Sequence, residues 1–308
     1  MALGRPLGIV MVLVTCTACS PYVYQTEIKT FTDGMKAVSD ADAQGAANLA
    51  AARSAADHRA WTARTDDDIT TAGCAVGLSG CRLTDATPTD FERELLTVRA
   101  EVDAERAKVV PTLKALNSYG RSLGAVTNAA DSASLAAAQG DLNAALERLV
   151  TTAGGAEAAP KVGVVASLFS GILRSVLEQQ RYDTLKDGTA EAQGYLEILK
   201  KQLAANLTVL HVSLQNELAL QIRSAETSLE AAKSRKVYAE RLAILADLAD
   251  RLAALQRADP AKLVTKMVDA HTGLRDALQT GKGQTVAVLQ NIREFAELAG
   301  TFATAFKA

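Results

Sequence analysis

The sequence predicts an all-α protein: an elongated antiparallel helical bundle, or coiled-coil-like rod, with one very long helix. Alanine and leucine, which favour helices, dominate the apolar residues, while runs rich in Val, Ile, Thr and Tyr, which favour strands, are scarce. Only 6 of the 308 residues are proline, which leaves room for long helices. Leucines also recur every three or four residues through the second half of the chain, which is the spacing of one helix face.

The longest helix is predicted from that leucine pattern. One apolar stripe runs from Ala192 to Leu229 at about 3.7 residues per step, the period of a nearly straight helix. The stripe continues to Leu255, and an unbroken helix over this length would reach roughly 100 Å at 1.5 Å per residue. Such a helix does not fit inside a compact sphere, so we expect a rod. If the helix folds back instead, the least regular apolar spacing places the bend at residues 233–236.

Three helices are predicted before it. The first covers residues 33–64 and follows an N-terminal tether over residues 20–32; small residues such as Gly45 on its apolar face allow close helix packing. The second starts at Thr87 and Pro88, a good N-cap followed by a good first helical residue. We expect Pro111 to kink or break it. The third covers residues 132–152.

The remaining helices are marked by proline and glycine. Pro160 opens a helix that we expect to be interrupted at residues 187–188. Asp259 and Pro260 start another helix, with the proline again in the favoured first position. A turn at residues 280–283 leads to the final helix. The last two helices form a hairpin that packs back along the long helix.

The first twenty residues, MALGRPLGIVMVLVTCTACS, have the layout of an export signal. Arg5 is the only charged residue, an apolar stretch follows from Leu7 to Val14, and small residues lead to a cysteine. This stretch is too short to span a bilayer as a stable anchor, but it is typical of a secretory signal peptide.

Thr17 and Ala18 directly before Cys19 resemble the lipobox of bacterial lipoproteins. The resemblance implies that residues 1–18 are removed and that the Cys19 thiol carries the lipid, with residues 19–32 as a lipidated tether before one bundle domain over residues 33–308. Cys16 offers a competing box, and an ordinary cleaved signal is the other alternative. In enterobacterial lipoproteins a residue other than Asp after the cysteine, here Ser20, indicates the outer membrane. The protein would then face the periplasm.

Two cysteines remain in the mature chain, Cys74 and Cys81, separated by the loop AVGLSG. In an oxidising periplasm we expect them to form a disulfide. A disulfide that closes so short a loop contributes only about 2.5 kcal/mol to stability, so it would constrain this one loop rather than stabilise the whole fold.

Composition and motifs argue against nucleic-acid binding and catalysis. The net charge is −2, so there is no basic excess to neutralise phosphates, and aromatic residues that could stack on bases are few. Residues 120–124 read GRSLG, but a G-x-S-x-G nucleophile elbow needs a preceding strand, and here both flanks have helical periodicity. The three histidines, His58, His211 and His271, belong to no metal or haem motif. We therefore expect no cofactor, no metal and no enzyme site.

The stretch VGVVASLFSGIL, residues 162–173, carries no charge. At twelve residues it is too short to span a bilayer, and a buried core helix is the ordinary interpretation. If exposed, it would mark a partner or membrane site. Two functions follow: a lipid-anchored, non-enzymatic envelope scaffold or accessory subunit that binds another protein, and a membrane-active protein, broadly similar to helical pore-forming toxins, that inserts residues 162–173.

Overall fold

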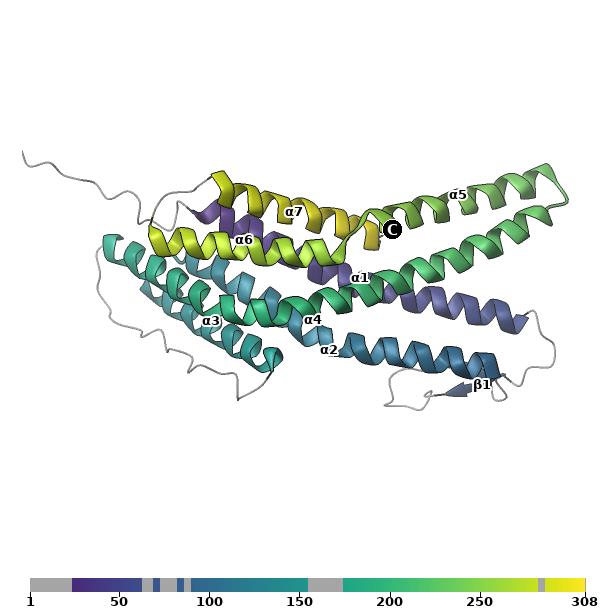
Figure 1. Ribbon diagram of the computed structural model, residues 1–308, viewed down its shortest axis with the longest axis horizontal. Coiled ribbons are helices and arrows are strands. Elements are labelled where there is room, and N and C mark those ends of the chain that lie inside the picture. Colours follow the sequence, from purple (N-terminus) through teal and green to yellow (C-terminus); the bar gives the residue numbers. More distant parts are fainter. Residues whose placement is uncertain are drawn as a thin grey trace, which may run out of the picture.

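The computed structural model describes residues 24–62, 69–72, 82–85, 90–154, 174–281 and 286–307. They form seven helices and one two-stranded antiparallel hairpin, with the helices aligned along one long axis (Figure 1). The prediction of an all-α, elongated antiparallel bundle is confirmed. No helix in these ranges is long and apolar enough to cross a membrane.

The first helix, α1 (Gln25–Thr62), starts earlier than predicted. Residues 25–32, assigned to the tether, are helical because Tyr24, Ile28, Phe31 and Met35 are buried at steps of three and four. The prediction of a tether reaching residue 32 is therefore wrong. The strands β1 (Ile69–Ala72) and β2 (Arg82–Asp85) were also not predicted, and they pair with Ile69 opposite Asp85 and Ala72 opposite Arg82.

Helix α2 (Asp90–Asn128) runs antiparallel to α1 and continues through Pro111. Of the two predicted outcomes, a kink or a break, the break does not occur. Proline in a helix interior costs about 3 kcal/mol, but Val109, Leu113 and Leu116 are buried on both sides of it, and their packing holds the helix together. Helix α3 (Ser132–Ala153) matches its prediction closely. The Asp131 carboxylate accepts a hydrogen bond from the Ser134 backbone N–H at 2.7 Å, which caps its first turn.

The predicted unbroken helix from Ala192 to Leu255 is wrong. Helix α4 (Arg174–Glu230) spans 57 residues, and after a turn α5 (Arg235–Arg257) folds back along it. The Ser234 hydroxyl caps α5 by accepting a hydrogen bond from the Val237 N–H at 3.3 Å. The interruption predicted at residues 187–188 is also wrong. Gly188 lies inside α4 because α3 approaches closely there: a Cβ on Gly188 would lie 2.7 Å from Leu142 Cδ2.

The C-terminal hairpin is confirmed as α6 (Pro260–Thr280) and α7 (Val286–Lys307). The Asp259 carboxylate accepts a hydrogen bond from the Lys262 N–H at 2.9 Å, with Pro260 in the first turn. Helix α7 packs on α1 and α6, and its apolar face is buried at Ile292, Phe295, Phe302 and Phe306.

The two ends of the bundle differ (Figure 1). One end has a single core that contains most of the fully buried side chains. This core is surrounded by α3, α6, α7 and the adjoining halves of α1, α2 and α4. At the other end α6, α7 and α3 are absent, and two helix pairs extend separately. One pair is the outer halves of α1 and α2. The other pair, residues 218–230 of α4 with residues 235–248 of α5, is called the α4–α5 arm below.

Candidate functional site

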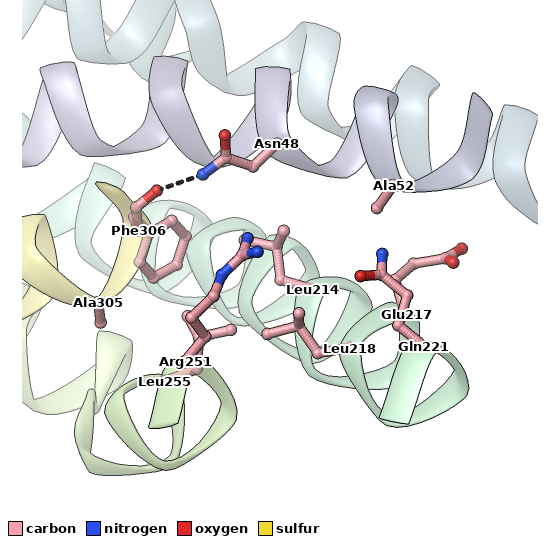
Figure 2. Close-up of a pocket in the computed structure, with 10 residues that line it drawn as sticks. All are labelled: Asn48, Ala52, Leu214, Glu217, Leu218, Gln221, Arg251, Leu255, Ala305 and Phe306. Atoms are coloured by element: carbon pink, nitrogen blue, oxygen red, sulfur yellow. Dashed lines mark hydrogen bonds between the residues drawn. The ribbon is translucent and has the colours of Figure 1, made fainter. Parts of the chain in front are cut away.

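The two helix pairs separate at a fork where α7 ends. A small pocket lies there, and Figure 2 shows its lining side chains from α1, α4, α5 and α7. Asn48 Nδ2 donates a hydrogen bond to the Phe306 backbone oxygen at 2.8 Å, which fixes the end of α7 on α1. The pocket measures about 20 Å³, room for roughly one water molecule. It is a packing gap at the fork rather than a substrate site.

A cluster of ion pairs lies beside this pocket, between α1, α2 and α4. Arg53 of α1 binds Asp103 of α2 at 3.0 Å, and Arg99 of α2 binds Asp57 of α1 at 2.7 Å, so the two pairs cross between the helices. Glu217 of α4 is buried between the two arginines, with Oε1 3.9 Å from Arg53 Nε and 3.7 Å from Arg99 Nη2. The cluster sets how three helices meet at the fork.

The Glu217 cluster is not fully hydrogen-bonded. Glu217 Oε2, Arg53 Nε and Arg99 Nε are buried, and within the described part of the chain they have no hydrogen-bond partner. Charges held this way contribute less to stability than apolar packing would, but they strongly favour one arrangement because a misplaced buried charge is costly. The two arginines face three carboxylates, so the cluster carries a formal charge of −1 and both guanidinium groups are already paired.

A further charged pair joins α1 and α2 nearer the end of the bundle that contains α3, α6 and α7. Arg106 Nη2 lies 3.7 Å from the Asp42 carboxylate, and Asp42 is buried. Burial raises the pKa of the Asp42 carboxyl, and Arg106 lowers it by a smaller amount. The outer halves of α1 and α2 are thus joined largely by charge.

The α4–α5 arm is joined by apolar contacts and leaves apolar side chains exposed. In α5 only Leu248 and Leu255 are buried. Tyr238, Leu242 and Ile244 are 47%, 45% and 56% exposed, all within seven residues of one helix. The arm is held internally by Arg241, which donates to the Ser228 backbone oxygen. Where α5 returns to the bundle, His211 Nε2 lies 2.7 Å from the Leu255 oxygen.

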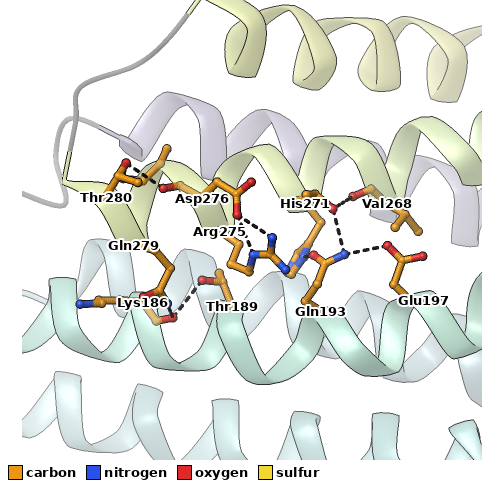
Figure 3. A network of polar contacts seen from close by, with 12 residues as sticks. Lys186, Thr189, Gln193, Glu197, Val268, His271, Arg275, Asp276, Gln279 and Thr280 are labelled. Atoms are coloured by element: carbon orange, nitrogen blue, oxygen red, sulfur yellow. Dashed lines mark hydrogen bonds and ion pairs between the residues drawn. The ribbon is translucent and has the colours of Figure 1, made fainter.

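A buried polar network lies in the core, away from the fork. His271 of α6 is completely buried, with Nδ1 2.7 Å from Gln193 Oε1 and Nε2 2.7 Å from Tyr119 Oη. Because the Gln193 oxygen can only accept, Nδ1 carries the proton and Nε2 accepts from the tyrosine hydroxyl. Gln193 Nε2 then donates to Thr272 at 2.8 Å and to Glu197 at 3.0 Å (Figure 3).

The same network shows shifted pKa values. Burial lowers the pKa of His271 to about 3, with a smaller contribution from Arg275 in the same direction. Burial raises the pKa of the Tyr119 hydroxyl well above its usual value. Shifted pKa values can mark catalytic sites, but His271 and Tyr119, the two groups with shifted values, are completely buried. Its role is to join α2, α4 and α6 in one register.

Several residues singled out from the sequence lie outside the described residues: Cys19, Cys74, Cys81 and residues 162–173. Their predicted lipidation, disulfide and core or membrane roles stay predictions. The β1–β2 pairing does show that Ala72 and Arg82, which flank the segment with both cysteines, are partners in the ladder. In the GRSLG stretch, Ser122 lies within α2 and donates a hydrogen bond to the Ser118 carbonyl at 3.0 Å, so it is an ordinary helical serine.

Comparisons with known proteins give no relative. No protein-family model, no curated protein and no solved structure matches this chain. Among the described residues there is also no group of three or more His, Cys, Asp or Glu side chains placed to hold a metal ion.

Proposed function

We propose that this protein is a lipid-anchored, non-enzymatic scaffold of the bacterial cell envelope, which binds a protein partner through the α4–α5 arm. One observation carries the proposal: α5 presents Tyr238, Leu242 and Ile244 to solvent on a helix pair that extends beyond the bundle. Isolated exposed apolar residues are common, whereas several gathered on one exposed helix indicate an interaction site.

Helix energetics support the same proposal. Two helices in contact bury one stripe each, and a stable bundle usually needs a third or fourth helix to cover the remaining apolar surface. At the end of the bundle that contains α3, α6 and α7, such additional helices are present. The arm lacks them, so a partner helix would bury the half of each of the Tyr238, Leu242 and Ile244 side chains that now faces water, worth about 1 kcal/mol per side chain.

The envelope location rests on the sequence. The resemblance of residues 17–19 to a lipobox supports a lipid on Cys19, and an elongated bundle tethered near one end would hold its arm away from the membrane. Replacing Cys19 with alanine should abolish palmitate labelling and release the protein from the membrane fraction, whereas Cys16→Ala should leave both unchanged. Palmitate labelling that persists in Cys19→Ala would contradict this part of the proposal.

Protein binding can be tested in the cell with a photo-crosslinking amino acid at position 242. Because Leu242 is exposed on α5, we expect a discrete protein adduct. The matched control is Leu96, a 52% exposed leucine on α2, which should give none. Equal labelling from both positions, or adducts with lipid alone at position 242, would contradict the proposal.

A membrane-active protein is the second candidate, and it rests on the uncharged stretch at residues 162–173. Such a protein would insert this stretch after a conformational change, so it should release dye from liposomes. A charged substitution, Val165→Asp, should abolish that release while Leu242→Glu leaves it intact. A scaffold should release no dye with either chain.

A further inference from the structure

We infer that one face of α5, formed by Tyr238, Leu242, Leu245 and Leu252, pairs with the same face of a second copy of this chain, with the two α5 helices antiparallel. The inference rests on the proposed function, because it names the partner of the α4–α5 arm. Two such arms would form a four-helix junction: two α4–α5 helix pairs, each covering the apolar face that the other leaves exposed.

The first support is the spacing of the exposed side chains. Tyr238, Leu242, Leu245 and Leu252 follow one another at steps of four, three and seven residues, which places them along one side of α5. Tyr238 and Leu242 are nearly half exposed, and Leu245 and Leu252 are half-buried. This is the pattern of a helix whose seam is only partly covered by its neighbour α4. A second helix of similar spacing would complete it.

The second support is the distribution of charge along α5. The turn and first part of the helix carry Lys233, Arg235, Lys236 and Arg241 against one acid, Glu240. The later part carries Asp247 and Asp250, followed by Arg251 and Arg257, so it has no net charge and both acids precede both arginines. A parallel pair would bring the basic segments together. An antiparallel pair centred near Leu242 places Arg235 of one copy beside Asp250 of the other, twice by symmetry, so the face is complementary to itself.

The third support is symmetry. A surface that is complementary to itself gives a closed two-fold dimer, which is the commonest assembly of soluble oligomers. A different partner protein would need no such match between the two ends of α5. Antiparallel packing of helical hairpins around an apolar core also has the geometry of an ordinary four-helix bundle.

The direct test is sedimentation equilibrium of the full chain in a density-matched detergent. The wild-type chain should form a dimer, and Leu242→Glu should weaken it by roughly 100-fold or more because two leucines at its centre become charged. Leu96→Glu, the matched exposed leucine on α2, should dimerise like the wild type. Thermal melting monitored by circular dichroism should show that both variants remain folded, since both positions face solvent.

The antiparallel register has its own test. Arg235→Glu and Asp250→Arg should each weaken the dimer by roughly tenfold, because each places like charges together twice. The double variant, which exchanges the two charges, should restore the wild-type affinity. Additive weakening in the double variant would overturn the register.

Three results would overturn self-pairing, and each bears differently on the proposed function. A monomeric wild type whose position 242 crosslinks to another protein in the cell would leave the scaffold proposal standing with a different partner. A monomer with no crosslink would overturn both. A monomeric Cys19→Ala chain that floats with phosphatidylethanolamine–phosphatidylglycerol vesicles only when Leu242 is intact would assign the face to lipid.

Discussion

Replacing His271 with alanine is expected to reduce the free energy of unfolding by about 4 kcal/mol. The change leaves a cavity in a fully buried site and removes the hydrogen-bond partner of both Tyr119 and Gln193. Chemical denaturation at pH 7 measures the effect. A loss below about 1 kcal/mol would mean that the network does not join α2, α4 and α6 as the structure indicates.

His271 should also make stability depend on pH. Its folded-state pKa of about 3 lies below the ordinary value of 6.5, so the unfolded chain takes up the proton first as the pH falls. The contribution of neutral His271 is therefore complete above pH 6.5 and is lost progressively toward pH 3, up to roughly 5 kcal/mol in total.

His271→Gln provides the control for this pH effect, since glutamine can hydrogen-bond but does not titrate. Between pH 6 and 4 its stability should fall less steeply than that of the wild type, by about 1.4 kcal/mol per pH unit. Parallel pH profiles for the two proteins would contradict the burial of a neutral histidine.

Gly45→Leu is expected to destabilise the bundle by about 3 kcal/mol, near the upper end of the cost of overfilling a packed core. Gly45 lies where α1 meets the end of α7: a Cβ there would lie 2.2 Å from Phe306 Cδ1 and 3.3 Å from Leu214 Cδ1. The aromatic ring is itself buried and has little room to move. Thermal unfolding of purified variants measures the change.

The matched control is Gly140→Leu in α3. A Cβ on Gly140 meets no atom within 4 Å, so leucine gains helix propensity without a clash. We expect it to stabilise the protein by about 0.5–1 kcal/mol. If both leucine variants change stability in the same direction, close packing at Gly45 is not what the glycine provides.

Much of the fold follows from local sequence patterns. The starts of α3 and α6 were predictable because Asp131 and Asp259 are local caps whose effect reaches only three residues along the chain. The role of Gly45 was also predictable, because a small residue on an otherwise apolar helix face has few uses other than close packing. These features need no knowledge of distant contacts.

The turn between α4 and α5 shows where that reasoning fails. The apolar spacing is least regular at residues 233–236, which correctly placed the alternative bend, but the stripe resumes on the far side, so periodicity alone does not decide between a continuous helix and two helices folded together. The missed local signal is Ser234, which caps α5 through the Val237 N–H. The prediction of a helix break at Pro111 failed for the opposite reason. The local signal, a proline inside a helix, was strong, but packing from other helices overrode it.

The candidate site was less predictable than the fold. Glu217, Arg53 and Arg99 come together from three helices that are distant in sequence, and no motif links them. The same is true of His271, whose partners Tyr119 and Gln193 lie 152 and 78 residues away. The exposed face of α5 also looked like core from the sequence, since its leucines continue the stripe that α4 buries.

The measurement that tests the central claim most directly is small-angle X-ray scattering of the full chain carrying Leu242→Glu in a contrast-matched detergent. Because the α4–α5 arm extends from an elongated bundle and is free to bind, we expect a radius of gyration well above the roughly 19 Å of a compact chain of this length. A radius close to 19 Å would mean that the arm folds onto the bundle and covers its own apolar face, which would contradict both the scaffold and the paired arms.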